Sequence, residues 1–423
     1  MTDRIIEFLK ASGADAWEVK DKSVKAWEFY FIRHNLDQNR VRDVEHIEVT
    51  VYRKLEDGKF LGSATQEIAP TASDEEAKKI IADLYNRASY VKNPYFELNK
   101  KPVQGGGENF DPSKMARDFI EVMQQIPETS TEDINSYEIF AESCTRRYVN
   151  SEGIDVTVSY PSSTVEVVVN ARNNDHEIEL YRMYTSGTCD NESLVKEISK
   201  TLSFGKDRLV AVPTPALDKA TVLFTTVDAV EIFKWFAMKT HAMFKYRRYS
   251  DWEKGKAICE GVEGDTFTIK AVKELPNSSY NAPVDSQGAE VRDMYILKNN
   301  VPENFWGDVQ FRYYLGVQDS FIATNFAAEG GELSESELRG GNYLEPVEFS
   351  DFSVDPITGD IAGEIRLAYW HEGDKVTPVT GGSVSGTLTD LIKNVRLSKE
   401  LTQYDTALIP SAIKIENVTI TGA

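Results

Sequence analysis

The sequence is poor in cysteine and has no long hydrophobic run. Only three cysteines occur, Cys144, Cys189 and Cys259, and none has Cys-x-x-Cys spacing, so we expect a reducing environment and no disulfide framework. The first residues, MTDRIIEFLK, interleave charged and apolar side chains and do not form the apolar segment of a signal peptide. No apolar run approaches the ~18 residues that a membrane-spanning helix needs. These absences predict a cytoplasmic protein.

Basic residues are also scarce. There are 47 Lys and Arg against 68 Asp and Glu, which gives a formal charge of −21. Such a surface repels a phosphate backbone, so we expect no direct nucleic-acid partner and no membrane partner. One basic stretch with interleaved aromatics, HAMFKYRRY at residues 241–249, could stack bases, but its shortness favours the end of a helix.

No motif of a known catalytic centre is present. His-Glu pairs occur at His176 and His371, but neither is followed within six residues by the second histidine that a helical zinc site needs. We expect both histidines to lie in turns or loops. The G-x-S-x-G elbow, the Walker loop and a strand-linked G-x-G-x-x-G are absent, which counts against serine hydrolase, P-loop and Rossmann functions. The residue patterns therefore assign no catalytic residue, no metal site and no cofactor to this chain.

What the sequence does contain is an α+β pattern. A chain of 423 residues with 41% hydrophobic and 27% charged residues predicts two to three globular domains. Residues 44–55 alternate as a strand does, Asp57-Gly58 predicts a hairpin turn, and Ser73 with Glu76 predicts a capped helix.

The rest of the chain is rich in strands, above all from about residue 256 to the end. Residues 137–185 predict several strands with turns at 162–163 and 173–175, and residues 227–244 predict one buried helix. We therefore expect an N-terminal α/β domain over residues 1–205, with an antiparallel sheet and flanking helices. A large, mostly antiparallel, barrel-like β domain is expected over residues 206–423.

Several segments, taken together, resemble the TldD/PmbA family, also called modulators of DNA gyrase. RYVNSEGIDV resembles a strand and Asn-Ser-x-Gly turn of the family's N-terminal domain, and NAPVDSQGAEVRDMYILKN resembles its "FD-x-EG" segment. The others match the opening and closing strands of its C-terminal domain. The segments are residues 147–156, 218–233, 281–299, 379–396 and 410–422.

This resemblance implies a two-domain architecture and peptide cleavage. It also implies that TldD-type subunits bind zinc through a His-Glu-x-x-x-His helix and a later cysteine, whereas PmbA (TldE) subunits lack these ligands and pair with a TldD subunit. In this chain the corresponding helix has Lys234-Trp235 near the expected His-Glu and Met238 or Lys239 near the second histidine, with His241 beyond. The resemblance is therefore closer to the PmbA/TldE branch.

The resemblance thus predicts a non-catalytic subunit of a metallopeptidase. Its partner would be a TldD-like chain carrying zinc, or a second copy of itself, and its substrates would be peptides. Two alternatives stay open: an active peptidase with an unusual centre built from His241, Cys259, His371 and Glu372, and a stand-alone binding or regulatory protein.

Six family-motif positions are candidates for a peptide cleft, although the residue types favour turns. They are Arg146, Asn150, Ser151, Gly153, Asp285 and Gly288, and Gln287 stands where the family often has an acid.

Overall fold

The computed structural model describes residues 1–423 and begins with one large, almost wholly antiparallel sheet. Its strand order is β4-β3-β2-β1-β6-β7-β5, with β8 pairing the other end of β7. The strands are β1 (Ala16–Ile32), β2 (Asn35–Leu55), β3 (Phe60–Ile68), β4 (Asn93–Pro94), β5 (Gly106–Gly107), β6 (Glu132–Asn150), β7 (Asp155–Arg172) and β8 (Glu177–Ser186). We call this sheet A.

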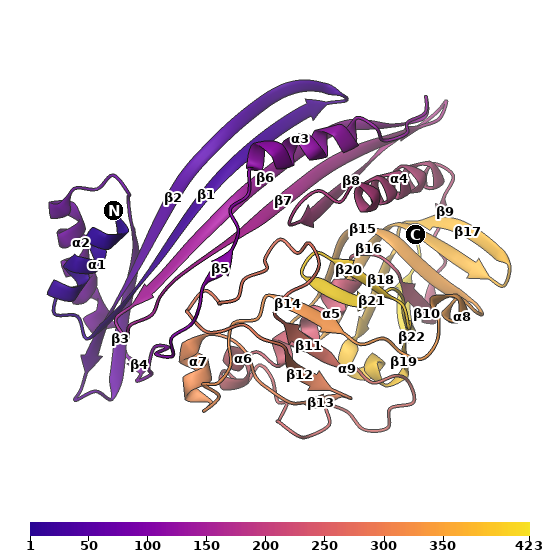
Figure 1. Cartoon of the computed structure of the whole chain (residues 1–423). Helices are drawn as coiled ribbons and strands as arrows, with labels where there is room; N and C mark the ends of the chain where they lie inside the picture. The colour runs from indigo at the N-terminus through magenta and orange to yellow at the C-terminus, as the bar shows by residue number, and fades with distance from the viewer.

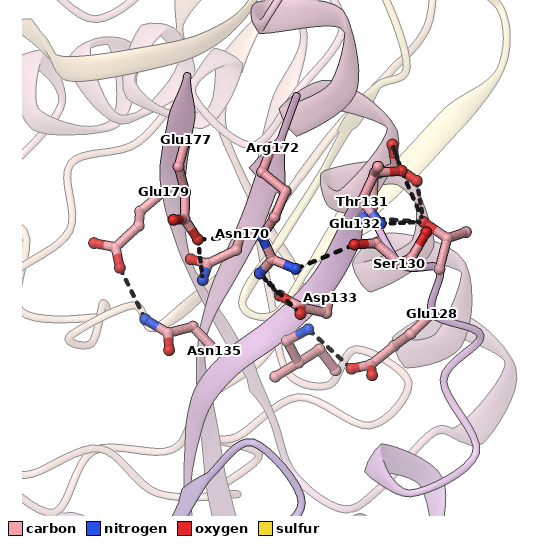
Figure 2. Close-up of polar contacts among 12 residues, drawn as sticks. Glu128, Ser130, Thr131, Glu132, Asp133, Asn135, Asn170, Arg172, Glu177 and Glu179 are labelled. Atoms are coloured by element: carbon pink, nitrogen blue, oxygen red, sulfur yellow. Dashed lines mark hydrogen bonds and ion pairs between the residues drawn. The ribbon is translucent and has the colours of Figure 1, made fainter. Parts of the chain in front are cut away.

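Four strands of sheet A are unusually long. β1, β2, β6 and β7 contain 17, 21, 19 and 18 residues, and together they arch over the C-terminal half of the chain (Figure 1). The turn predicted at residues 162–163 is therefore wrong. Ser162 and Ser163 continue β7 and pair with Glu142 and Ala141, because the β-branched residues on both sides favour an uninterrupted strand.

Four helices cover one face of sheet A. At one end, α1 (Thr2–Ala11) and α2 (Asp74–Arg87) pack on Trp17, Val19 and Val49. The capping box of Ser73 and Glu76 begins α2 as predicted. At the other end, α3 (Pro112–Met123) and α4 (Asn191–Arg208) pack on Ile139 and Val167 of the same face.

The C-terminal half contains a closed barrel. Strands β15, β10, β22, β18 and β16 pair in that order, and β15 also pairs with β16, which closes the ring. β17 and β9 extend β16, and β19 pairs with β22. The bounds are β9 (Val212–Pro213), β10 (Leu217–Phe224), β15 (Tyr343–Val354), β16 (Asp360–Glu372), β17 (Lys375–Thr380), β18 (Ser383–Thr387), β19 (Val395–Leu397) and β22 (Ile413–Thr421). The predicted fold class is confirmed.

A third sheet lies beside the barrel, in the order β13-β12-β11-β14-β21-β20. Its strands are β11 (Ile269–Val272), β12 (Met294–Lys298), β13 (Val301–Pro302), β14 (Asn325–Ala328), β20 (Leu401–Tyr404) and β21 (Ala407–Pro410). The helices of this half are α5 (Ala229–Lys239), α6 (Ala242–Tyr246), α7 (Val309–Tyr314), α8 (Glu335–Leu338) and α9 (Leu388–Leu391). Two short 3₁₀ helices, η1 (Ala88–Tyr90) and η2 (Ile392–Asn394), complete the chain.

The core of the C-terminal half lies between α5, the barrel and the third sheet. The helix predicted over 227–244 is in fact two helices, because His241 adopts an extended conformation and caps α6. None of the helices combines the length and the apolar character needed to cross a membrane.

Candidate functional site

The segment expected from the resemblance to correspond to the zinc helix forms α5 (Ala229–Lys239). Lys234 lies on its exposed side, where its Nζ is 2.6 Å from Glu231 Oε1. The next residue, Trp235, points into the core with only 2% of its surface exposed, and its ring meets Phe236 and Trp252 edge to face. Met238 is half-buried. One helix face is thus filled by core aromatics and the other carries an ion pair.

His241 follows α5 and has a structural role at the start of α6. Its Nδ1 accepts the backbone N–H of Met243 at 3.1 Å, and its ring packs against Trp306 with 4.5 Å between centroids. Burial lowers the pKa of His241, and the carboxylate of Asp308, 3.9 Å from Nε2, only partly opposes this. Since Nδ1 is an acceptor, His241 is neutral in this arrangement.

The donor groups that a zinc ion requires do not converge in this chain. The prediction that His371 lies in a loop is wrong. It lies at the end of β16, where its ring stacks on Tyr343 and its Nε2 is 3.1 Å from the carboxylate of Glu345. Cys259 lies beside Asn300. No group of three or more His, Cys, Asp and Glu side chains could hold a metal ion, so the residues present do not fit a zinc site.

The Asn-Ser-x-Gly segment forms the tight turn between β6 and β7. Asn150 Oδ1 accepts the backbone N–H groups of Glu152 and Ile154 at 3.0 and 3.1 Å. Ser151 Oγ accepts the N–H of Trp17 at 3.1 Å, and Gly153 has φ +99°. These contacts shape the turn, and the same residues line an open groove of about 650 Å³ beside α1.

Next to this turn, sheet A is joined to residues 280–289 of the C-terminal half. Arg146 donates to the hydroxyl of Tyr280 and, at 2.8 Å, to the carbonyl of Val284. The side-chain N–H of Asn150 donates to Asn99 O, and Asn99 in turn donates to Gln287 O at 2.7 Å. We call this contact region the turn seam.

Asp285 and Gly288 fix the C-terminal side of the turn seam. Asp285 is 2% exposed and accepts the backbone N–H groups of Gln287, Ala289 and Ile322 at 2.8, 2.9 and 2.7 Å. Gly288 has φ +78°, and a Cβ atom there would lie 2.9 Å from the ring of Tyr148. Four of the six predicted positions, Arg146, Asn150, Asp285 and Gly288, therefore belong to one junction.

The residue patterns missed a buried carboxylate behind this junction. Glu18 is 3% exposed and accepts the hydroxyls of Tyr148 and Tyr52 at 2.8 and 3.2 Å. Burial and the neighbouring Glu18 raise the pKa of both tyrosines, so they remain donors. In the sequence, Glu18 is an acidic residue between Trp17 and Val19 in a predicted strand. Many half-exposed strand positions have the same pattern, so the sequence does not indicate that Glu18 is buried.

A second junction links sheet A to the barrel near α4. Arg182 of β8 lies 2.9 Å from the carboxylate of Glu348 and donates to Val347 O at 2.7 Å, while Tyr369 donates to Asp207. Apolar side chains of α4 and β16 surround these groups. Burial raises the pKa of Glu348 to about 7, because it outweighs the pairing with Arg182. We call this region the strand seam.

A cavity of about 280 Å³ opens beside the strand seam, lined by Lys196, Lys200, Glu345, Tyr369 and Tyr404 among others. Burial raises the pKa of Glu345, but its bonds to Arg339, Thr225 and His371 outweigh burial and leave that pKa lowered. None of the predicted site residues lines this cavity.

Comparison with known proteins agrees with this architecture. Across the full length of both chains, the structure superposes on TldE from Thermococcus kodakarensis with a TM-score of 0.77 at 16% identity. A protein described as a modulator of DNA gyrase from Thermotoga maritima superposes with a TM-score of 0.76 at 16% identity, over 100% of this chain and 99% of its own. An uncharacterized protein of Methanocaldococcus jannaschii is 22% identical over 85% of this chain and 86% of its own.

The arched antiparallel sheet followed by a barrel half defines the class of fold shared with these structures. Residues 218–422 match the family model of the PmbA/TldA metallopeptidase C-terminal domain. The C-terminal half of the chain therefore contains the C-terminal domain of the PmbA/TldD family.

Proposed function

We propose that this chain is a TldE-like, non-catalytic subunit of a cytoplasmic TldD/PmbA-type metallopeptidase. Its partner is a TldD-like chain that supplies the zinc ligands, and its role is to complete the chamber in which peptides are cleaved. The observation that carries the proposal is the sequence of α5, where Lys234 and Trp235 stand near the expected His-Glu and Met238 or Lys239 near the second histidine. Replacing the buried Trp235 by the glutamate of the motif would also remove part of the core.

Two further observations support this proposal. Lys234 is ion-paired as a charged ammonium group and offers no lone pair to a metal. The other groups proposed for an unusual centre are also unsuited, since His241 Nδ1 and His371 Nε2 already have partners and Cys259 lies apart from both.

The experiment is reconstitution with a TldD-like chain that carries the His-Glu-x-x-x-His helix, from the same genome. Both chains are purified separately and together, and three quantities are measured: mass in solution, zinc per chain and hydrolysis of a mixed peptide library. We expect zinc-dependent hydrolysis only when both chains are present, with the metal in the partner.

The matched control is the same pair with the partner's motif glutamate changed to glutamine, which should bind this chain and cleave nothing. Hydrolysis by this chain alone, sensitive to a chelator, would instead favour the peptidase with an unusual centre. A chain that neither binds the partner nor changes its activity would favour a stand-alone binding protein.

A further inference from the structure

The outer half of sheet A has one face that no other part of the chain covers. α3 and α4 pack on Ile139 and Val167, so the neighbouring residues Glu138 and Glu166 point to the opposite face. Across the strands, Tyr30 pairs with Glu138, Glu138 with Glu166, and Glu166 with Met183. Met183 is 56% exposed, and neither Met183 nor Tyr30 packs into a hydrophobic core.

Two carboxylates stand directly opposite each other in this row. Neither Glu138 nor Glu166 forms an ion pair, and Glu166 accepts a single hydrogen bond, 2.9 Å from the hydroxyl of Tyr181. Burial and the charge of Glu166 raise the pKa of Glu138. Like charges directly opposite each other destabilise a strand pair. Glu28 on the same face forms ion pairs with Arg40 and Arg42, whereas Glu138 and Glu166 have no such partner.

The strand next to this row, β8, is the edge strand at this end of sheet A. It has ten residues, three of them charged, contains no proline or lysine and pairs with β7 without a bulge. Arg208 reaches the carbonyl of Glu179, which therefore points away from β7. By the two-residue period of a strand, the backbone groups of Tyr181 and Met183 also point outward. No hydrogen bond outside the β7–β8 ladder reaches them.

We propose that β8 and the adjoining sheet face bind an extended, basic polypeptide segment. The segment pairs its backbone with the outer edge of β8 and directs a lysine or arginine side chain toward Glu166. The occupant is chosen by charge complementarity, because the row presents two carboxylates without a cation beside exposed Tyr181 and Met183. This proposal rests on the surface of sheet A alone and is independent of the proposed metallopeptidase role.

The dimensions of a sheet allow this contact. Adjacent strands lie about 4.8 Å apart, so an added strand lies about 9.6 Å from β7. A lysine or arginine can extend across Met183 with its aliphatic stem on that side chain and its charged head at Glu166. Glu166 already inclines toward β8, as its hydrogen bond with Tyr181 shows. The ring of Tyr181 adds a favourable cation–π contact.

The test uses the full chain and three fluorescein-labelled peptides of about ten residues. One alternates lysine and valine, one alternates glutamate and valine, and one is the lysine peptide with proline at every second valine. Fluorescence anisotropy at physiological salt measures each Kd. We expect the lysine–valine peptide to bind at least about tenfold more tightly than the other two. Equal binding of the proline-containing peptide would overturn the strand pairing.

Three variants locate the site. Glu166→Gln should weaken binding of the lysine peptide about fivefold, and Met183→Pro about tenfold, because the proline removes an outward N–H without breaking the β7 ladder. Glu166→Lys should reverse the preference toward the glutamate peptide, which keeps the test informative if the proline variant misfolds. The matched control is Glu75→Gln, an exposed acid on α2 that should change nothing.

Equal weakening by Glu75→Gln and Glu166→Gln would show general attraction to an acidic protein and overturn the proposal. A change in the mass of the free protein on Met183→Pro, from two chains to one, would show that a second copy occupies β8 and would also overturn it.

Discussion

The two seams that hold sheet A against the C-terminal half are built in different ways. At the turn seam, Arg146 and Asp285 make most of their bonds to backbone groups, which do not titrate. At the strand seam, Arg182 and Glu348 form a buried pair of side-chain charges within an apolar layer. Burial raises the pKa of Asp285, and its three backbone N–H donors oppose that shift. At the strand seam, burial raises the pKa of Glu348 to about 7 despite the pairing with Arg182, so this seam changes its charge near neutral pH.

The largest effect is expected at Asp285. The Asp285→Ala substitution leaves three buried N–H groups without their acceptor and removes the negative charge near Arg312, so we expect a loss of roughly 3–5 kcal/mol in the free energy of unfolding or failure to fold. Urea denaturation measures it. Asp285→Asn keeps the shape and one acceptor oxygen and should lose clearly less. A loss below about 1 kcal/mol for the alanine variant would contradict the rigid turn seam.

Gly288 tests the same seam through sterics. Gly288→Ala should lose about 2–3 kcal/mol, since it combines a positive φ with a contact 2.9 Å from the Tyr148 ring. Gly153→Ala is the matched control, because Gly153 also has positive φ but open space around its Cβ position, and it should lose about 1 kcal/mol. The difference between the urea denaturation midpoints of the two variants measures the contribution of the Tyr148 contact. Equal losses of stability would show that this contact contributes nothing.

Glu348 tests the strand seam through pH. Its pKa of about 7 in the folded state lies above the ordinary value of 4.5, so its contribution to stability is complete below pH 4.5 and is lost as the pH rises through 7. Glu348→Gln should flatten the stability profile between pH 5 and 8 by on the order of 2 kcal/mol. Melting temperatures across that range measure it. An unchanged slope would show that Arg182 keeps the carboxylate ionised throughout.

Ser151 should have the smallest effect. Ser151→Ala removes one acceptor for the N–H of Trp17 at a partly exposed turn, and we expect a loss of about 1 kcal/mol or less. Peptide hydrolysis by the complex with a TldD-like chain is the second measurement. A large loss of hydrolysis with unchanged stability would assign Ser151 to a peptide cleft and not only to the turn.

Local patterns in the sequence predict the elements well where one period dominates. The capping box at Ser73 and the hairpin at Asp57-Gly58 follow from short-range hydrogen bonding and appear as predicted. The two serines at 162–163 mislead, because the pairing of β7 with β6 and β8 outweighs the turn preference of single residues. His371 misleads for the same reason, since its strand is set by pairing with β15.

The site was less predictable, because its contacts join residues far apart in the chain. Arg146 and Val284 are 138 residues apart, and nothing near either residue signals their bond. Glu18 and Glu348 look like ordinary surface acids in the sequence, and only the packing of other elements buries them. The turn types of Asn150 and Gly153 could be inferred, but not the junction that they support.

The order of strands in the barrel has a consequence for synthesis on the ribosome. β22 pairs with β10, β18 and β19, yet it is the last barrel strand in chain order and begins 189 residues after β10 ends. The barrel therefore cannot close until residues 413–421 have left the exit tunnel. Until then β10 and β18 each have one edge without a hydrogen-bonding partner. Sheet A is complete by residue 186 and can form much earlier, so during synthesis a folded sheet A precedes a barrel that is still open.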